Sequence, residues 1–182
     1  LVFYLQDGKV QTACFFIPHS YPSTEDYSNG VITKTFYFER PDPTIKKWNE
    51  QFRTKVNQFI RDEKIYEAIL LNDNNELTEG SRSNLFFIDQ KNRLNTAPEN
   101  KILPGITRKY VLLICAKNKI PVIERLVPLS EVKTMKSCFI TGTSPKVLPV
   151  RTLNEMNFDH ERALLKTLIK EYDKMILAQL KD

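Results

Sequence analysis

Short apolar runs separated by turn-forming residues are the feature that most constrains the fold of this chain. Residues 66–72 (YEAILLN), 83–89 (SNLFFID) and 93–97 (RLNTA) are short for helices, and Asn-, Asp- and Gly-containing turns lie between them. Residues 31–40 (VITKTFYFER) alternate apolar and polar side chains, as a half-buried strand does. The pattern predicts a sheet in which hairpins connect most neighbouring strands.

Other segments complete the predicted set of elements. Helical spacing of apolar residues predicts amphipathic helices over residues 44–64, 105–119 and 158–180, and a short helix over residues 129–135 with Ser130 as its N-cap. Further strands are expected at residues 122–127, 137–142 and 147–153, and residues 1–17 predict two strands around the Asp7-Gly8 turn. Strands outnumber helices, so the expected fold class is α+β, with a mixed or antiparallel sheet and flanking helices.

Composition narrows the class of protein. The 182 residues suffice for one well-cored domain, and the net charge is +5 with a pI near 9.0. Lys and Arg alternate with Asp and Glu, and no basic run with interleaved aromatic residues occurs, so we expect a mixed, solvated surface and no nucleic-acid partner. The apolar runs are too short to span a bilayer, and the N-terminus lacks the layout of a signal peptide.

Cysteine and histidine usage bears on location and on metals. Cys14, Cys115 and Cys138 are widely spaced, odd in number and set among apolar residues, which predicts reduced core cysteines of a cytoplasmic protein. With two histidines and no C-x-x-C spacing, no metal site is expected.

Three of the five glycines share a setting. Gly80, Gly105 and Gly142 each follow an apolar segment and are flanked by Thr or Ser. The loop LPGITRKYVLL opens directly into a predicted helix, whose free N–H groups and dipole favour an anion. Neither G-x-x-x-x-G-K-[ST] nor G-x-G-x-x-G is present. The trio is equally consistent with a phosphate cradle and with three plain turns.

Glu79 lies between two apolar strands and has two interpretations. It is either a surface hairpin carboxylate or a buried one, and a buried carboxylate needs a cationic partner. The protonated ring nitrogen of pyridoxal phosphate is one such cation, and a lysine would then be needed to hold that cofactor. Helical spacing places Lys55 on the apolar face, seven residues after Trp48, while Lys46 lies near the helix start. Lys55 is therefore a candidate, unless it merely extends its amine to solvent.

Three motifs in a fixed order resemble a known family. E-G-S-x-S-N (residues 79–84), L-P-G-I-T-R (residues 103–108) and T-G-T (residues 141–143) are similar to those of the class IV (fold type IV) pyridoxal-phosphate enzymes. That family includes branched-chain and D-amino-acid aminotransferases and aminodeoxychorismate lyase. The resemblance extends over residues 40–150.

The resemblance implies roles for individual residues. IKKWN matches a Lys-x-x-Asn motif, which makes Lys46 rather than Lys55 the catalytic lysine that bonds the cofactor, and Glu79 matches the carboxylate that pairs with the ring nitrogen. Arg82 and Ser144 are candidate substrate contacts, although Arg82 is also consistent with an ordinary surface arginine. The other implied cofactor-binding residues are Ser83, Asn84, Leu103, Ile106, Thr107, Gly142 and Thr143.

The resemblance also implies an architecture and an activity. We expect residues 1–17 to be the remnant of a small N-terminal domain that is otherwise largely absent, residues 18–30 a linker, and residues 31–182 the large domain of the D-amino-acid-aminotransferase-like fold. The implied enzyme is a homodimer that transfers an amino group between a small amino acid and a 2-oxo acid. Alternatives are a lyase of the aminodeoxychorismate type and a catalytically silent homologue. Glu50 follows Asn49 where the lyases tend to have Arg, which argues weakly against the lyase.

Overall fold

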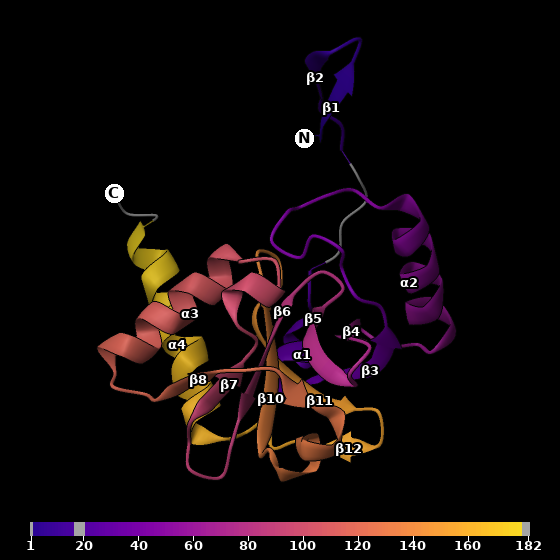
Figure 1. Ribbon diagram of the computed structural model, residues 1–182. Coiled ribbons are helices and arrows are strands. Elements are labelled where there is room, and N and C mark those ends of the chain that lie inside the picture. Colours follow the sequence, from indigo (N-terminus) through magenta and orange to yellow (C-terminus); the bar gives the residue numbers. More distant parts are fainter. Residues whose placement is uncertain (1, 17–20, 180–182) are drawn as a thin grey trace.

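The computed structural model describes residues 2–16 and 21–179. Strands β1 (Val2–Gln6) and β2 (Lys9–Ala13) form an antiparallel hairpin that is a two-stranded sheet of its own. Asp7 and Gly8 make the turn with φ angles of 51° and 72°, the left-handed region that such turns require. The predicted hairpin is confirmed, and it contributes no strand to the main sheet (Figure 1).

The main sheet is mixed, as the sequence predicts. Its order is β8-β7-β6-β10-β11-β3-β4-β5-β9, with β12 paired to β11. β3 runs parallel to β4 and β11, and β7 runs parallel to β8, whereas the other pairs are antiparallel. The strands are β3 (Val31–Tyr37), β4 (Glu67–Leu71), β5 (Glu76–Gly80), β6 (Asn84–Ile88), β7 (Leu94–Thr96), β8 (Val122–Glu124), β9 (Val127–Pro128), β10 (Ser137–Gly142), β11 (Lys146–Leu153) and β12 (Met156–Asn157).

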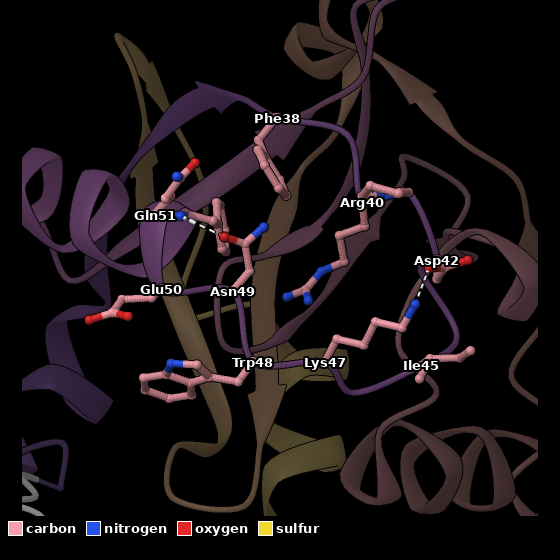
Figure 2. A pocket seen from close by; sticks show the side chains of 11 residues that line it. Phe38, Arg40, Asp42, Ile45, Lys47, Trp48, Asn49, Glu50 and Gln51 are labelled. Atoms are coloured by element: carbon pink, nitrogen blue, oxygen red, sulfur yellow. Dashed lines mark hydrogen bonds and ion pairs between the residues drawn. The ribbon is translucent and has the colours of Figure 1, made fainter. Parts of the chain in front are cut away.

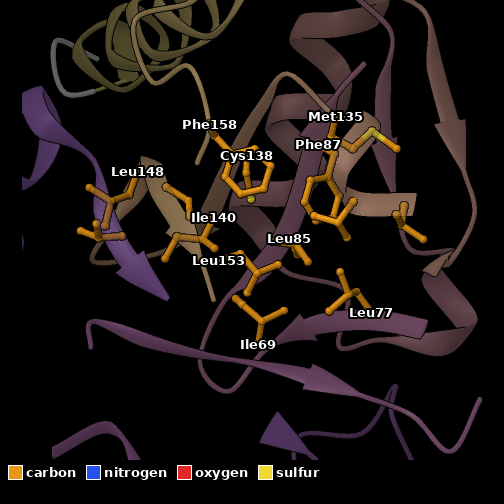
Figure 3. Packing of buried hydrophobic residues seen from close by; sticks show 14 of the residues in the cluster. Ile69, Leu77, Leu85, Phe87, Met135, Cys138, Ile140, Leu148, Leu153 and Phe158 are labelled. Carbon is orange, nitrogen blue, oxygen red and sulfur yellow. The ribbon is translucent and has the colours of Figure 1, made fainter. Parts of the chain in front are cut away.

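The sheet curls so that β5 and β6 lie side by side, although four strands separate them in the pairing order. The Gly80 N–H donates to the Ser83 carbonyl at 2.8 Å across the turn that joins them. The inner face holds the largest apolar cluster, drawn in Figure 3, to which Ile69, Leu85 and Ile140 contribute. The direct pairing of β6 with β10, in which Asn84 lies opposite Thr141, places the β5–β6 turn beside the end of β10.

Three longer helices cover the outer faces of the sheet. Helices α3 (Ile106–Lys117) and α4 (Ala163–Gln179) pack on β10 and β11 around a second cluster that includes Val111, Phe139 and Leu168. Helix α2 (Glu50–Asp62) buries Phe52 and Val56 against β4. Two 3₁₀ helices, η1 (Glu99–Lys101) and η2 (Leu129–Thr134), lie in the connections. The α+β class is thus the observed one.

A short helix lies within the segment predicted as a linker. Helix α1 (Thr24–Asn29) begins after Ser23, which forms a capping box with Asp26. The Tyr27 hydroxyl donates to the Pro145 carbonyl at 3.0 Å, so α1 is fastened to the start of β11. Residues 18–20 of the predicted linker lie outside the described residues.

Some details of the sequence prediction are wrong. Helix α2 begins at Glu50, because the Asn49 side chain caps it by accepting from the Phe52 N–H at 2.9 Å. Residues 44–49 are not helical, so the spacing from Trp48 does not apply, and Lys55 is exposed. The N-cap residue of η2 is Pro128 and not Ser130, which was predicted for this position.

Two further predictions need correction. Helix α4 begins at Ala163, because Phe158 is buried in the cluster inside the sheet and the chain turns after it. Cys115 and Cys138 are free and buried as predicted, but Cys14 is exposed, because it follows the outlying hairpin. No helix among the described residues is long and apolar enough to cross a membrane.

Candidate active site

A buried carboxylate on β4 anchors the β5–β6 turn. Glu67 Oε1 accepts from the Ser81 hydroxyl at 2.7 Å and from the Ala68 N–H at 3.0 Å. Its Oε2 accepts from the Ser83 hydroxyl at 3.0 Å and from the Arg82 N–H at 3.2 Å. At Gly80 a Cβ atom would lie 2.1 Å from Ser83 Oγ and 3.1 Å from Glu67 Cγ, so only glycine fits against this anchor. Ser81 and Ser83 therefore serve as donors to Glu67, and Gly80 leaves the space that this contact requires.

The same turn fixes Glu79, which is 3% exposed. Glu79 Oε2 accepts from the Leu103 N–H at 3.1 Å and from Asn84 Nδ2 at 3.4 Å, and Asn84 Nδ2 also donates to the Leu103 carbonyl at 2.8 Å. A Cβ atom at Gly105 would lie 2.2 Å from Asn84 Oδ1. The structure thus brings Glu79 and Asn84 of the β5–β6 turn together with Leu103 and Gly105 before α3. Leu103 takes part through its backbone.

The cation beside Glu79 is Arg40, from the segment that follows β3. Arg40 Nε lies 2.7 Å from Glu79 Oε1, but its N–H does not point at that oxygen, and both atoms are buried without a hydrogen bond. Burial raises the pKa of Glu79 to about 7, while the adjacent Arg40 guanidinium and the Leu103 N–H pull it downward. The carboxylate therefore has a counter-charge and one oxygen that can still accept a hydrogen bond.

Sequence reasoning required a cation for a buried Glu79 but did not name Arg40. The residue lies 39 positions before Glu79, and only the pairing of β3 with β4 and of β4 with β5 brings the two together. Glu67 was not predicted either. Its apolar neighbours in YEAILL indicated a buried strand, and a carboxylate within such a strand was the signal that could have revealed it.

The first turn of α3 offers free backbone N–H groups. Gly105 is the N-cap, with φ −73° and ψ 142°, and no side chain caps the helix. Ile106 is 71% exposed, whereas Thr107 is buried and its Oγ1 accepts from the Tyr172 hydroxyl at 3.3 Å. Arg108 is buried as well and donates to the Ala97 carbonyl at 3.0 Å. The helix start is held rigidly, and its amides remain available to an anion.

The predicted second phosphate loop lies at the end of β10. A Cβ atom at Gly142 would lie 3.6 Å from the Arg82 carbonyl oxygen, so this loop contacts the β5–β6 turn. Thr141, the β-sheet partner of Asn84, is buried, and its Oγ1 has no hydrogen bond. Thr143 is exposed and Ser144 is half-buried.

Ser83, Arg82 and Lys46 are the remaining predicted site residues, and none of them contacts Glu79 through a hydrogen bond or ion pair among the described residues. Ser83 bonds Glu67, and the exposed Arg82 donates from its guanidinium to the Tyr66 carbonyl at 3.3 Å. Lys46 is exposed in the segment between β3 and α2, and no hydrogen bond or ion pair joins it to another described residue.

A cavity of about 420 Å³ lies beside this segment (Figure 2). Arg40 extends into it from one wall, while Phe38, Trp48 and Asn49 form other parts of its lining. The neighbours of Lys46 on both sides, Ile45 and Lys47, line the cavity too. Arg40 therefore connects this cavity to Glu79.

The fold and these motifs define a class of protein, and comparison with known proteins agrees. Residues 3–153 match the family model of class IV aminotransferases, and the chain belongs to this family. It is 36% identical over 114 residues to a protein named probable branched-chain-amino-acid aminotransferase from Thermotoga maritima, covering 62% of this chain and 42% of that protein. It is 33% identical over 148 residues to the D-alanine aminotransferase of Bacillus licheniformis, covering 79% of this chain and 50% of that one.

Solved structures show the same fold. A Thermotoga maritima structure described provisionally as a branched-chain amino acid aminotransferase has a TM-score of 0.77 at 31% identity, over 88% of this chain and 59% of that one. The Escherichia coli branched-chain amino acid aminotransferase has a TM-score of 0.67 at 25% identity, over 77% and 50%. This chain spans about half the length of the curated relatives that it matches.

Proposed function

We propose that this protein is a pyridoxal-phosphate-dependent aminotransferase that transfers an amino group between a small amino acid and a 2-oxo acid. The observation that carries the proposal is Glu79, a buried carboxylate with one oxygen that lacks a hydrogen bond. It lies against the uncapped start of α3 in a chain of the class IV family. The relatives named as aminotransferases support the same reaction class.

The residues present fit this cofactor. Oε1 of Glu79 is the acceptor that a protonated ring nitrogen needs, and the amides of Ile106 and Thr107 suit a phosphate. Gly142 and Thr143 would supply further donors, with Asn84 holding Glu79 in place. When bound, pyridoxal phosphate supplies an electron sink for the α-carbon of an amino acid.

Lys46 would hold the cofactor covalently and carry the α-proton on Nζ. A lysine that accepts a proton near neutral pH needs a pKa well below its ordinary value of about 10.4. Lys46 is exposed, so the proposal requires the segment between β3 and α2 to enclose it when the cofactor is bound. This position is the observation that favours the silent homologue as the second candidate.

Assembly and location belong to the same proposal. Phe3, Leu5 and Val10 of the β1–β2 hairpin are largely exposed, which supports an interface there, and we propose a homodimer. We further propose a cytoplasmic location, with residues 1–17 belonging to a unit separate from residues 31–182. Sedimentation of the purified protein would test the dimer.

Lys46→Ala, with Lys55→Ala as its matched control, tests the function. We expect Lys46→Ala to abolish both the visible absorption of bound cofactor and the amine transfer to 2-oxo acids, and Lys55→Ala to preserve both. Cofactor absorption without amine transfer, across a panel of small amino acids, would favour the lyase. A wild-type protein with neither signal would establish the silent homologue.

A further inference from the structure

We propose that Arg40 is a positioning residue whose charge favours the ionised form of Glu79 while Glu79 Oε1 stays free to accept a hydrogen bond from the cofactor's ring nitrogen. The second half of this inference rests on the proposed function. The first half concerns the protein alone and stands on the geometry around Glu79.

The two oxygens of Glu79 are treated differently by the fold. Oε2 has two neutral donors, the Leu103 N–H and the Asn84 amide, which fix the orientation of the carboxylate. Oε1 has no directed donor, although Arg40 Nε lies 2.7 Å away. A guanidinium that donated directly would occupy one of the two lone pairs of Oε1. In this structure the charge of Arg40 attracts the Glu79 carboxylate, while Oε1 has no donor directed at it.

Other contacts hold Arg40 in this off-axis position. Its Nη2 donates to the Ser81 carbonyl at 3.4 Å, and its guanidinium carbon lies 5.7 Å from the centre of the Phe52 ring. The side chain is 15% exposed, so its charge is only weakly screened. Phe52 is buried on α2, which ties the placement of Arg40 to the packing of that helix.

The charge balance around Glu79 makes Arg40 necessary. Burial disfavours ionisation of Glu79, and the negative charge of Glu67 on the neighbouring strand acts in the same direction. Arg53 of α2 and Arg82 of the turn are the other cations in this region, but neither forms an ion pair with Glu79. Without Arg40 the pKa of Glu79 would rise further above 7, and the carboxyl group would be largely protonated at neutral pH.

Arg40→Met tests the first half in protein prepared without added cofactor. The readout is the infrared absorption of protonated carboxyl groups during a pH titration, taken as a difference from the same titration of Glu79→Gln. We expect Arg40→Met to raise the titration midpoint of Glu79 by about one pH unit or more. Arg40→Lys, which keeps the charge, should restore most of the wild-type midpoint.

Arg53→Met is the matched control, because the Arg53 guanidinium also lies 5.7 Å from the centre of the Phe52 ring. It should leave the midpoint close to that of the wild type. An unchanged midpoint in Arg40→Met, or an equal shift in Arg53→Met, would overturn the proposal. Should Arg40→Met fail to fold, Arg40→Gln answers the same question with a polar side chain.

The second half is tested with pyridoxal phosphate and an analogue whose ring nitrogen is replaced by carbon. Arg40→Met should weaken binding of pyridoxal phosphate at least several-fold more than binding of the analogue. Equal weakening of both would show that Arg40 acts on the cofactor in some other way. A wild-type protein that binds neither compound would remove the proposed function, while the carboxyl titration would still decide the role of Arg40.

Discussion

Glu67 and Glu79 are buried carboxylates on the paired strands β4 and β5, yet their surroundings differ in kind. Glu67 accepts four hydrogen bonds, from two hydroxyls and two backbone N–H groups, so both of its oxygens are occupied. Glu79 has two donors on one oxygen, none on the other and a guanidinium close by.

We interpret this difference as that between a structural carboxylate, Glu67, and a carboxylate available to a ligand, Glu79. A saturated carboxylate has no remaining capacity for a ligand, and its role is to hold the β5–β6 turn in shape. A carboxylate with an unoccupied oxygen costs stability, and native proteins keep such groups where function requires them. Replacing Glu79 should therefore mainly lower turnover, whereas replacing Glu67 should mainly lower the free energy of unfolding.

The largest expected effect is that of Glu79→Gln on turnover. The variant keeps the shape of the side chain but removes the charge that would hold a proton on the cofactor's ring nitrogen. We expect kcat for amine transfer to fall by about a hundredfold or more, in the range seen when one electrostatic partner is removed. Steady-state kinetics measure this, and circular dichroism checks that the fold is retained. Full turnover would assign Glu79 a purely structural role.

The next effect is a dependence of stability on pH that Glu79 alone contributes. Its pKa in the folded protein is about 7 against an ordinary 4.5, so between these values the folded state binds the proton more strongly than the unfolded state. Stability from this group is present below pH 4.5 and is lost as pH rises to 7. The free energy of unfolding falls by roughly 3 kcal/mol over this range, because the pKa of Glu79 rises from 4.5 to about 7 on folding.

Urea unfolding of the wild type and of Glu79→Gln at a series of pH values would measure this loss. Carboxylates with a lowered pKa, such as Asp89 and Glu131, have the opposite effect, because the stability that they give the folded protein is lost as pH falls. They are common to both proteins and cancel in the difference. A difference that stays flat from pH 4.5 to 7 would contradict the raised pKa of Glu79.

The two carboxylates also illustrate which features of this chain can be predicted from its sequence and which cannot. The α+β class, the strands β4 and β6 and the free N–H groups at the start of α3 followed from apolar spacing and from glycine placement, which are local signals, whereas β5 was not among the predicted strands. The motif at residues 79–84 led to Glu79. Arg40 and Glu67 act through contacts 39 and 14–16 residues away, and only the order of the strands determines such pairs. The helix start at Glu50 was missed because the apolar spacing continues past the capping residue Asn49 to Trp48 and Ile45.

Glu67→Gln should show the signature of the structural carboxylate. An amide has one acceptor oxygen, so at least one of the two backbone N–H groups loses its partner. We expect the free energy of unfolding to fall by about 1–3 kcal/mol, the cost of a buried unsatisfied group. The amine-transfer rate of the folded protein should fall far less than in Glu79→Gln. Kinetic loss as large as that of Glu79→Gln, without loss of stability, would place both carboxylates in the reaction.

The smallest effects come from Ser81→Ala and Ser83→Ala, and they decide a point that the sequence left open. The resemblance assigned Ser83 to the cofactor, whereas the structure shows both hydroxyls donating to Glu67. If Ser83 serves only Glu67, each variant should lose about 1 kcal/mol of unfolding free energy and bind pyridoxal phosphate with near wild-type affinity. If Ser83 also binds the cofactor, Ser83→Ala alone should weaken that affinity. Cofactor titration of the two variants side by side would then move Ser83 from the structural carboxylate to the functional one.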